Sequence, residues 1–331
     1  MPVEIPYQPL DSPVTWVGSK KKLRAILYAV FPAGYSRYIE VFGGSGNVLL
    51  GKPPDCFEVY NDFNGDLVNL FRCIRDRPMA LLNNLGFLNL NSRDDFKVLR
   101  KFFKQEEFHD DFLEEELELT RLMLPECSAQ EIIELRNTKS KDFDVRRASM
   151  YLRLIRTSYS SMGKSFASQP FHVGKLKSLI WDAYRRLETV VIENQHFAVL
   201  IKHYDRRGAF FYCDPPYLNT ETMYDAMFNW DDHLTLRKLA GDCKGYFLIS
   251  YNDCPEIRNL YDGFWFFDFK RAHCMAQRTD PGKEFPELLI ANYDMFAPHR
   301  EKPTQTTLFE DDKELSEEEI NQIIKECIIN G

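Results

Sequence analysis

A short apolar run that ends in an acid and two prolines constrains the fold of this chain most strongly. The four residues before Asp214 are apolar or aromatic and follow an Arg-Arg-Gly stretch, which predicts a buried central strand. Pro215 and Pro216 end that strand, because proline donates no ladder hydrogen bond and holds the residue before it extended. Asp214 is therefore expected at the carboxyl end of a buried strand, where open α/β sheets bind ligands. The structural alternative is an ordinary turn whose aspartate caps a following helix.

The residues after this strand suit the activation of a weakly nucleophilic amine. The lone pair of an exocyclic amine on a nucleobase is delocalised into the ring. A carboxylate and a backbone carbonyl that accept its two N–H groups would localise that lone pair and orient it toward a methyl donor. Asp214 and the carbonyl of Pro215 can do this, and Tyr217 offers a ring for a base taken out of the duplex. These three are the predicted catalytic residues.

A second motif predicts a nucleotide-cofactor site. An expected strand at 38–42 runs into a glycine-rich turn at 43–46 and then into an apolar helix start. Glycine lets the backbone approach a ligand, and the helix N-terminus faces that ligand. The next expected strand, 57–60, ends in Asn61 and Asp62, and an acid at this place commonly binds ribose hydroxyls. A plain tight turn is the alternative for the glycines alone, but both strands together favour a cofactor.

Together these motifs resemble the Dam class of adenine-specific DNA methyltransferases, whose order is cofactor region, target-recognition region, catalytic region. The four similar segments are the tryptophan-to-lysine opening, the cofactor loop, the ribose-binding segment and the catalytic tetrad, at 16–20, 40–46, 61–67 and 214–217. Ser19 stands where the family often has glycine, and Val41 where it often has proline. Neither change removes a functional group.

The resemblance implies S-adenosyl-L-methionine as the cofactor. Segment 194–197 is similar to the family segment beside the cofactor adenine, although His196 stands where an acid is common. The cofactor-binding residues that the resemblance implies are Trp16, Lys20, Glu40, Phe42, Gly44, Gly46, Asp62, Phe63, Phe197 and Asp214.

The expected fold is α/β, a Rossmann-like seven-stranded methyltransferase sheet with a largely helical inserted target-recognition domain. Strands are predicted near 38, 57, 190, 210, 247, 266 and 289, and the last two should pair as an antiparallel hairpin. Helices are predicted in the insert near 78–88, 93–106, 112–123, 128–137 and 145–155. The expected divisions are an arm and cofactor part, the insert, the catalytic part and an acidic tail, at 1–73, 74–188, 189–297 and 298–331.

The expected partner is double-stranded DNA, although the net charge is −8. The acidity is concentrated near 106–118 and 310–319, so basic clusters elsewhere can still bind phosphates. The stretch 153–172 reads either as a DNA-contacting loop or as a solvated polar loop. Segment 218–232 reads either as a flap over the flipped base or as a packed loop. The predicted DNA-binding residues are Lys22, Arg156, Lys164, Arg271 and Arg278.

Further patterns bear on the tail and on the cellular setting. Residues 305–309 resemble peptides that dock on bacterial sliding clamps through Gln305, Leu308 and Phe309; a tail packed on its own domain is the alternative. The eight cysteines form no CxxC pair, which indicates reduced, mostly buried thiols in a cytoplasmic protein without a metal site. No apolar run approaches the length of a membrane span.

The predicted activity is methyl transfer from S-adenosyl-L-methionine to a flipped adenine, without a covalent enzyme intermediate. Cys213 lies inside the expected strand, where it would pack rather than react. One alternative keeps the chemistry and changes the acceptor to RNA, cytosine or a protein amide. Another is a DNA-binding relative without turnover.

Overall fold

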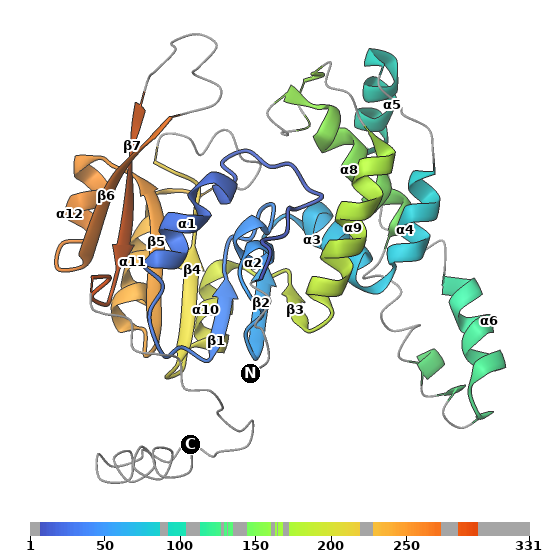
Figure 1. The fold of residues 1–331 in the computed structure, drawn as a ribbon, viewed down its shortest axis with the longest axis horizontal. Coiled ribbons are helices and arrows are strands. Elements are labelled where there is room, and N and C mark those ends of the chain that lie inside the picture. The colour runs from blue at the N-terminus through green and yellow to red at the C-terminus, as the bar shows by residue number, and fades with distance from the viewer. Residues whose placement is uncertain are drawn as a thin grey trace.

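A seven-stranded sheet forms the centre of the molecule (Figure 1). The computed structural model describes residues 7–86, 92–103, 113–126, 129–130, 132–134, 144–159, 163, 165–167, 172–218, 228–272 and 284–296. The strands are β1 (Arg37–Glu40), β2 (Phe57–Asn61), β3 (Val190–Glu193), β4 (Ala209–Cys213), β5 (Tyr246–Asn252), β6 (Trp265–Ala272) and β7 (Glu284–Ala291). Their order is β3-β2-β1-β4-β5-β7-β6, so the predicted α/β fold with a seven-stranded sheet is confirmed.

The strand order reverses between β1 and β4, and this reversal decides where a ligand can bind. The pairs β1·β2, β2·β3, β1·β4 and β4·β5 are parallel, whereas β7 pairs antiparallel with both β5 and β6. The chain thus builds outward from β1 to one side and then returns to β4 on the other. Loops that leave β1 and β4 diverge at such a point and open a crevice at the carboxyl edge. The predicted hairpin of the last two strands is confirmed.

Alternating residues of the central strands bury two different sets of helices, as a sheet covered on both faces requires. Tyr38 and Tyr60 face one apolar cluster, to which helices α1, α3, α8 and α9 contribute. Their strand neighbours, Ile39 in β1 and Val59 in β2, face the opposite side of the sheet. They pack in a second apolar cluster, to which α10, α11 and α12 contribute. The sheet is buried on both sides, which explains the continuous apolar runs in the sequence.

The helices on the sheet include short as well as long ones. They are the 3₁₀-helix η1 (Lys20–Leu23), α1 (Arg24–Ala29), α2 (Asn47–Gly51), α3 (Gly65–Asp76), α10 (Phe197–Tyr204), α11 (Trp230–Asp242) and α12 (Pro255–Leu260). Helix α1 ends at Ala29, and Pro32 disfavours helical backbone at Phe31, the residue before it.

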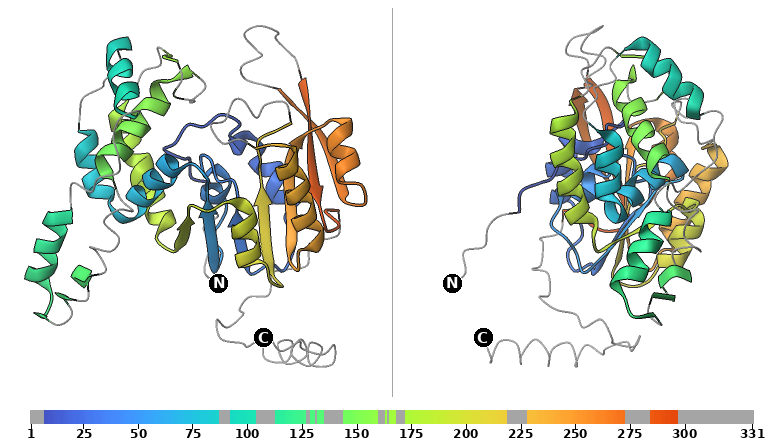
Figure 2. Two further views of the ribbon diagram at one scale, coloured as in Figure 1. Left: turned by 180° about the vertical axis from the view of Figure 1, so that it is seen from behind. Right: turned by 90° about the vertical axis from the view of Figure 1, so that its right-hand side faces the viewer.

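The inserted helices stand beside the β3 edge of the sheet (Figures 1 and 2). They are α4 (Pro78–Leu85), α5 (Arg93–Phe103), α6 (Leu113–Met123), α8 (Val145–Thr157) and α9 (Val173–Leu187). Residues 129–130 and 132–134 are also helical, within the helix predicted near 128–137. Because α8 and α9 share an apolar cluster with α3 and the sheet, part of the insert is continuous with the main core. The division expected after residue 73 falls inside α3.

Helix α8 extends into the stretch that was predicted to be a loop. The helix predicted near 145–155 is confirmed and ends at Thr157, so the loop interpretation of 153–172 is wrong for residues 153–157. Arg153 explains this difference, since its side chain is buried and its guanidinium donates a hydrogen bond to the carbonyl of Leu85. A positive charge in the sequence therefore marked a helix-packing contact between α8 and α4.

A buried ion-pair network fixes α9 to the second strand. The carboxylate of Glu58 on β2 accepts a 2.7 Å hydrogen bond from Arg186 on α9, and it also pairs with Lys52. All three residues are buried, with exposed fractions between 1% and 6%. Charges held this far from water are tolerated only when each has a partner, so the network depends on its central acid.

We expect Glu58→Ala to lower the free energy of unfolding by about 3–5 kcal/mol, because buried Arg186 loses its anion and Lys52 keeps only its ion pair with Asp55. Urea denaturation monitored by circular dichroism measures this change. The matched control is Asp268→Ala, which removes an ion pair to Arg258 in which Asp268 is 61% exposed. That variant should lose at most about 1 kcal/mol. Equal losses in both variants would contradict the role of the buried network.

Candidate active site

A single cavity joins the two motifs that the sequence separates. It has a volume of about 950 Å³ and lies at the carboxyl edge of the sheet, around the reversal between β1 and β4. The predicted site residues that line it are Trp16, Lys20, Glu40, Phe42, Gly44, Asp62, Phe63, Phe197 and Asp214. Gly46, Pro215 and Tyr217 lie outside the lining, whereas Pro216 is part of it.

Asp62 organises the glycine-rich turn that follows β1. Its carboxylate accepts hydrogen bonds from the backbone N–H of Gly44 at 2.9 Å and of Asn64 at 2.8 Å. Burial raises the pKa of Asp62, and the hydrogen bonds from Asn64 and Gly44 partly oppose that rise. A carboxylate oxygen accepts more than one hydrogen bond, so Asp62 can hold the turn and still accept from a ligand.

The turn allows close backbone approach because side chains would not fit. Gly44 has φ of +50°, and a Cβ there would lie 2.9 Å from the ring of Trp16. A Cβ on Gly43 would lie 2.2 Å from the ring of Tyr60. Gly46 has φ of +63° and sits behind the turn, where a Cβ would meet Phe71 at 3.1 Å. The cradle is therefore shaped by residues that lack side chains.

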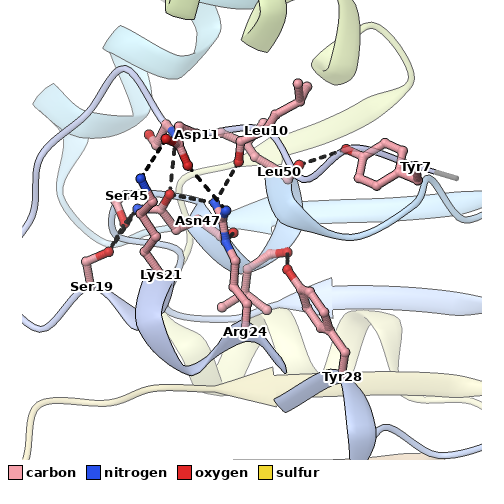
Figure 3. Close-up of polar contacts among 12 residues, drawn as sticks. Tyr7, Leu10, Asp11, Ser19, Lys21, Arg24, Tyr28, Ser45, Asn47 and Leu50 are labelled. Carbon is pink, nitrogen blue, oxygen red and sulfur yellow. Dashed lines mark hydrogen bonds and ion pairs between the residues drawn. The ribbon is translucent and has the colours of Figure 1, made fainter. Parts of the chain in front are cut away.

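The N-terminal arm is tied to this turn through Arg24 and Asn47 (Figure 3). The guanidinium of Arg24 donates at 2.7 Å to the carbonyl of Leu10 and to both the backbone and side-chain oxygens of Asn47. The Asn47 amide in turn donates at 2.8 Å to the hydroxyls of Ser19 and Ser45. This network holds the arm, the segment before η1 and helix α2 together, so it sets the position of Trp16 and Lys20 on the cavity wall.

Lys20 connects the N-terminal segment with the catalytic tetrad. Its ammonium lies 2.6 Å from both carboxylate oxygens of Asp214 and donates at 3.1 Å to the carbonyl of Gly18. It also lies 4.9 Å from the centre of the Tyr217 ring. The Lys20 side chain is only 4% exposed, so dissolved salt screens this ion pair much less than it would screen an exposed one. The aspartate of the tetrad is thereby fixed at the edge of the cavity.

Glu40 is a cavity-lining acid whose pKa is raised. It is the last residue of β1 and is buried, and the hydroxyl of Tyr38 donates to its carboxyl at 3.0 Å. Burial raises the pKa of Glu40 to about 8. Near neutral pH the carboxyl is therefore mostly protonated and can donate a hydrogen bond as well as accept one.

Aromatic side chains form the wall on the α10 side. Phe42, Phe197 and Phe228 contact one another with ring centroids 5.5–5.8 Å apart. Phe63 is 60% exposed and meets the ring of His196 edge to face at 6.1 Å. These rings leave an apolar slot beside Asp62, which suits a flat heterocycle. Phe228 was not among the predicted site residues, although it belongs to segment 218–232, which was predicted to be either a flap over the flipped base or a packed loop.

The insert supplies the opposite wall, which the sequence did not predict. Arg100 and Phe103 of α5 and Tyr151 of α8 line the cavity. The amide of Asn64 donates to the hydroxyl of Tyr151 at 3.3 Å, and Arg147 pairs with Asp66. The loop after β2 is thus linked directly to the insert. These residues lie in amphipathic helices, where their spacing indicates packing and carries no signal of a site.

The predicted DNA-binding residues are only partly described. Lys22 is exposed on η1. Arg156 donates at 2.6 Å to the carbonyl of Pro13, so it is used at least in part to hold the arm. Arg271 lies in β6, but its side chain is outside the described residues, as are Lys164 and Arg278 entirely. Most of the expected flap and the whole clamp-like peptide are also outside them.

Two further expectations concern the burial of the cysteine thiols and the absence of a membrane span. Of the five cysteines in the described part of the chain, Cys73 and Cys213 are buried, Cys243 and Cys254 are half-buried, and all are free thiols. Cys56, which directly precedes β2, is exposed and is the exception to the expected burial. Within the described ranges, no helix is both long and apolar enough to cross a membrane.

The sheet and its cavity define a Rossmann-like methyltransferase, with glycine turn and acidic tetrad on opposite sides of the strand reversal. Residues 16–279 match the D12 class N6 adenine-specific DNA methyltransferases, and the chain belongs to that family. It is 21% identical over 298 residues to the type II methyltransferase M1.LlaDCHI of Lactococcus lactis subsp. cremoris, across 84% of this chain and 94% of that protein. The protein is therefore an enzyme that methylates adenine in DNA, and it uses a methyl donor.

We expect Gly43→Ala to lower the free energy of unfolding by about 1–3 kcal/mol, because the new methyl group overlaps the Tyr60 ring. The control is Gly174→Ala in α9, where a Cβ meets nothing within 4 Å. It should raise that free energy by about 0.5–1 kcal/mol through helix propensity. Chemical denaturation of both variants gives the comparison. A Gly43→Ala protein as stable as the wild type would contradict the tight cradle.

Glu40 predicts a pH dependence of stability. The folded protein holds the Glu40 proton more tightly than the unfolded chain does. The protonated carboxyl therefore adds to the free energy of unfolding, fully below about pH 4.5, and this added stability is lost as pH rises through about 8. Glu40→Gln removes the titration and keeps an acceptor for Tyr38. Between about pH 5 and 8, wild-type stability should fall relative to the variant by up to about 1.4 kcal/mol per pH unit. Parallel pH profiles in urea denaturation would contradict the raised pKa.

Proposed function

We propose that the chain moves the methyl group of S-adenosyl-L-methionine to the exocyclic amine of an adenine that has rotated out of the duplex. The observation that carries this proposal is that Asp214 and the glycine cradle line one cavity. A donor and an acceptor amine held there would react in a closed site rather than in bulk water. The proposed catalytic residues are Asp214, Pro215 and Tyr217.

The residues present fit the proposed donor. Gly43 and Gly44 line the cavity with backbone alone, and the apolar slot beside Asp62 suits an adenine ring. The side-chain oxygen of Gln195 is buried and has no hydrogen-bond partner among the described residues, although Gln195 lines the cavity. An exocyclic amine is a natural donor to such an oxygen. When bound, the donor supplies an electrophilic methyl group on a sulfonium.

One residue that the family resemblance implies for donor binding, Gly46, does not line the cavity. Gly46 lies behind the cradle, so we assign it a conformational role in the turn. The other proposed donor-binding residues are Trp16, Lys20, Glu40, Phe42, Gly44, Asp62, Phe63, Phe197 and Asp214.

In the proposed reaction, Asp214 orients the acceptor. An ionised carboxylate offers about four lone-pair positions, and the Lys20 ammonium uses positions on both oxygens. Asp214 can therefore stay fixed by Lys20 and still accept an N–H of the amine, while the Pro215 carbonyl accepts the other. These bonds localise the nitrogen lone pair. Cys213 takes no part, since burial raises the pKa of its thiol well above the ordinary value.

We further propose that Lys22, Arg156, Lys164, Arg271 and Arg278 contact the phosphates of double-stranded DNA. Arg100, which is exposed at the rim of the cavity on α5, is an additional described cation on the insert side. Such contacts would position the duplex so that the target base reaches Tyr217. Clamp binding through Gln305, Leu308 and Phe309, and a cytoplasmic location, remain predictions from the sequence.

We expect Asp214→Ala to lower methyl transfer at least a hundredfold while folding is retained, because the amine loses its charged acceptor. The measurement is methylation-sensitive long-read sequencing of plasmid DNA from a host without adenine methylation that expresses each variant. The wild type should modify adenine within one short sequence. Asp268→Ala, the exposed-acid control, should modify the same sites fully. Full adenine modification by Asp214→Ala, or cytosine modification by the wild type, would contradict the proposal.

A further inference from the structure

A buried acid on the last strand contacts the tyrosine of the catalytic tetrad. The hydroxyl of Tyr217 donates a 2.6 Å hydrogen bond to the carboxylate of Glu287. Glu287 is 3% exposed and lies in β7, where it pairs with Asn252 of β5 and Phe269 of β6. Nothing in the sequence around Glu287 indicated a role in the site.

Sheet topology explains how this acid reaches the tetrad. Because β7 runs antiparallel to β5, its beginning lies at the edge where β4 and β5 end. That edge carries Asp214 and Tyr217 directly after β4. The antiparallel hairpin therefore brings a carboxylate to Tyr217 across 70 positions of the sequence. A parallel strand in the same place would begin at the opposite edge.

Three contacts fix the Tyr217 ring. Its hydroxyl is held by Glu287, the Lys20 ammonium lies 4.9 Å from its centroid, and the Tyr251 ring lies 6.1 Å away at an angle of 42°. A tyrosine ring has two side-chain torsions, so a hydrogen bond at its far end together with contacts on the ring restrains both. The orientation of the ring plane is thus set by residues from three separate parts of the chain.

We propose that Glu287 is a positioning residue for methyl transfer, which acts by holding and polarising Tyr217. This inference rests on the proposed function, in which the target base stacks on that ring. A phenol that donates to a carboxylate forms a charge-assisted hydrogen bond, which is stronger than a neutral one and shifts electron density toward the ring. The amine of the base gains positive charge as it takes up the methyl group. A fixed, electron-rich aromatic face stabilises a cation stacked on it.

The test is a double-mutant cycle on the full chain. Glu287→Gln keeps the shape of the side chain and removes its charge, and Tyr217→Phe keeps the ring and removes the hydroxyl. We measure single-turnover transfer of radiolabelled methyl from S-adenosyl-L-methionine to plasmid DNA from a host without adenine methylation. Each variant should slow transfer about tenfold. The double variant should also be about tenfold slower, since both changes break the same hydrogen bond.

The chain offers a matched control with the same chemistry. Tyr204 of α10 donates a 2.7 Å hydrogen bond to Glu193 of β3, and neither residue lines the cavity. Tyr204→Phe should leave the single-turnover rate unchanged. For Glu287→Gln, the affinities for S-adenosyl-L-methionine and for plasmid DNA and the melting temperature should stay within twofold and about 3 °C of wild type. A merely structural role would lower these together with the rate.

Two further results would overturn the inference while leaving the proposed function intact. One is a wild-type rate in Glu287→Gln. The other is a double variant about a hundredfold slower, because independent effects multiply. A wild-type chain that transferred no methyl group to adenine would instead overturn the proposed function, and the role of Glu287 with it.

Discussion

The rest of the site depends on the ion pair between Lys20 and Asp214, which joins two cavity-lining residues that are 194 positions apart in the sequence. One partner follows the N-terminal arm, and the other follows the central strand β4. The Arg24 and Asn47 network positions the first, and the proline-bounded strand end positions the second. Neither segment would define a cavity without the other. The strand reversal between β1 and β4 brings them to the same edge of the sheet.

The acids at this edge of the sheet differ in their partners and in their burial. Asp214 is paired with a cation, Asp62 with backbone N–H groups, and Glu40 with a tyrosine hydroxyl. Glu40 is the acid whose pKa burial raises to about 8, so it adds a neutral donor to the wall. Glu287 is buried behind Tyr217. Acidic side chains thus pair with a cation, shape a turn, line a wall or hold a ring, according to what surrounds them.

The sequence predicted the strands and the cavity wall around the glycine-rich turn, because both leave local signals. Buried strands are short continuous apolar runs, and the cradle requires glycines next to a strand end. Arg100, Tyr151 and Glu287 left no such signal. Each has the spacing of an ordinary helix or strand residue and reaches the site only through long-range packing. The loop interpretation of residues 153–157 failed for a related reason, since the buried Arg153 reads as a surface charge in the sequence.

The central claim is that donor and catalytic aspartate share one cavity. Ultraviolet crosslinking of methyl-labelled S-adenosyl-L-methionine to the protein, followed by peptide mass spectrometry, tests it most directly. We expect adducts on aromatic residues of the lining, in particular Phe42, Phe63 and Phe197. Saturable adducts confined to residues outside this cavity would contradict the shared site.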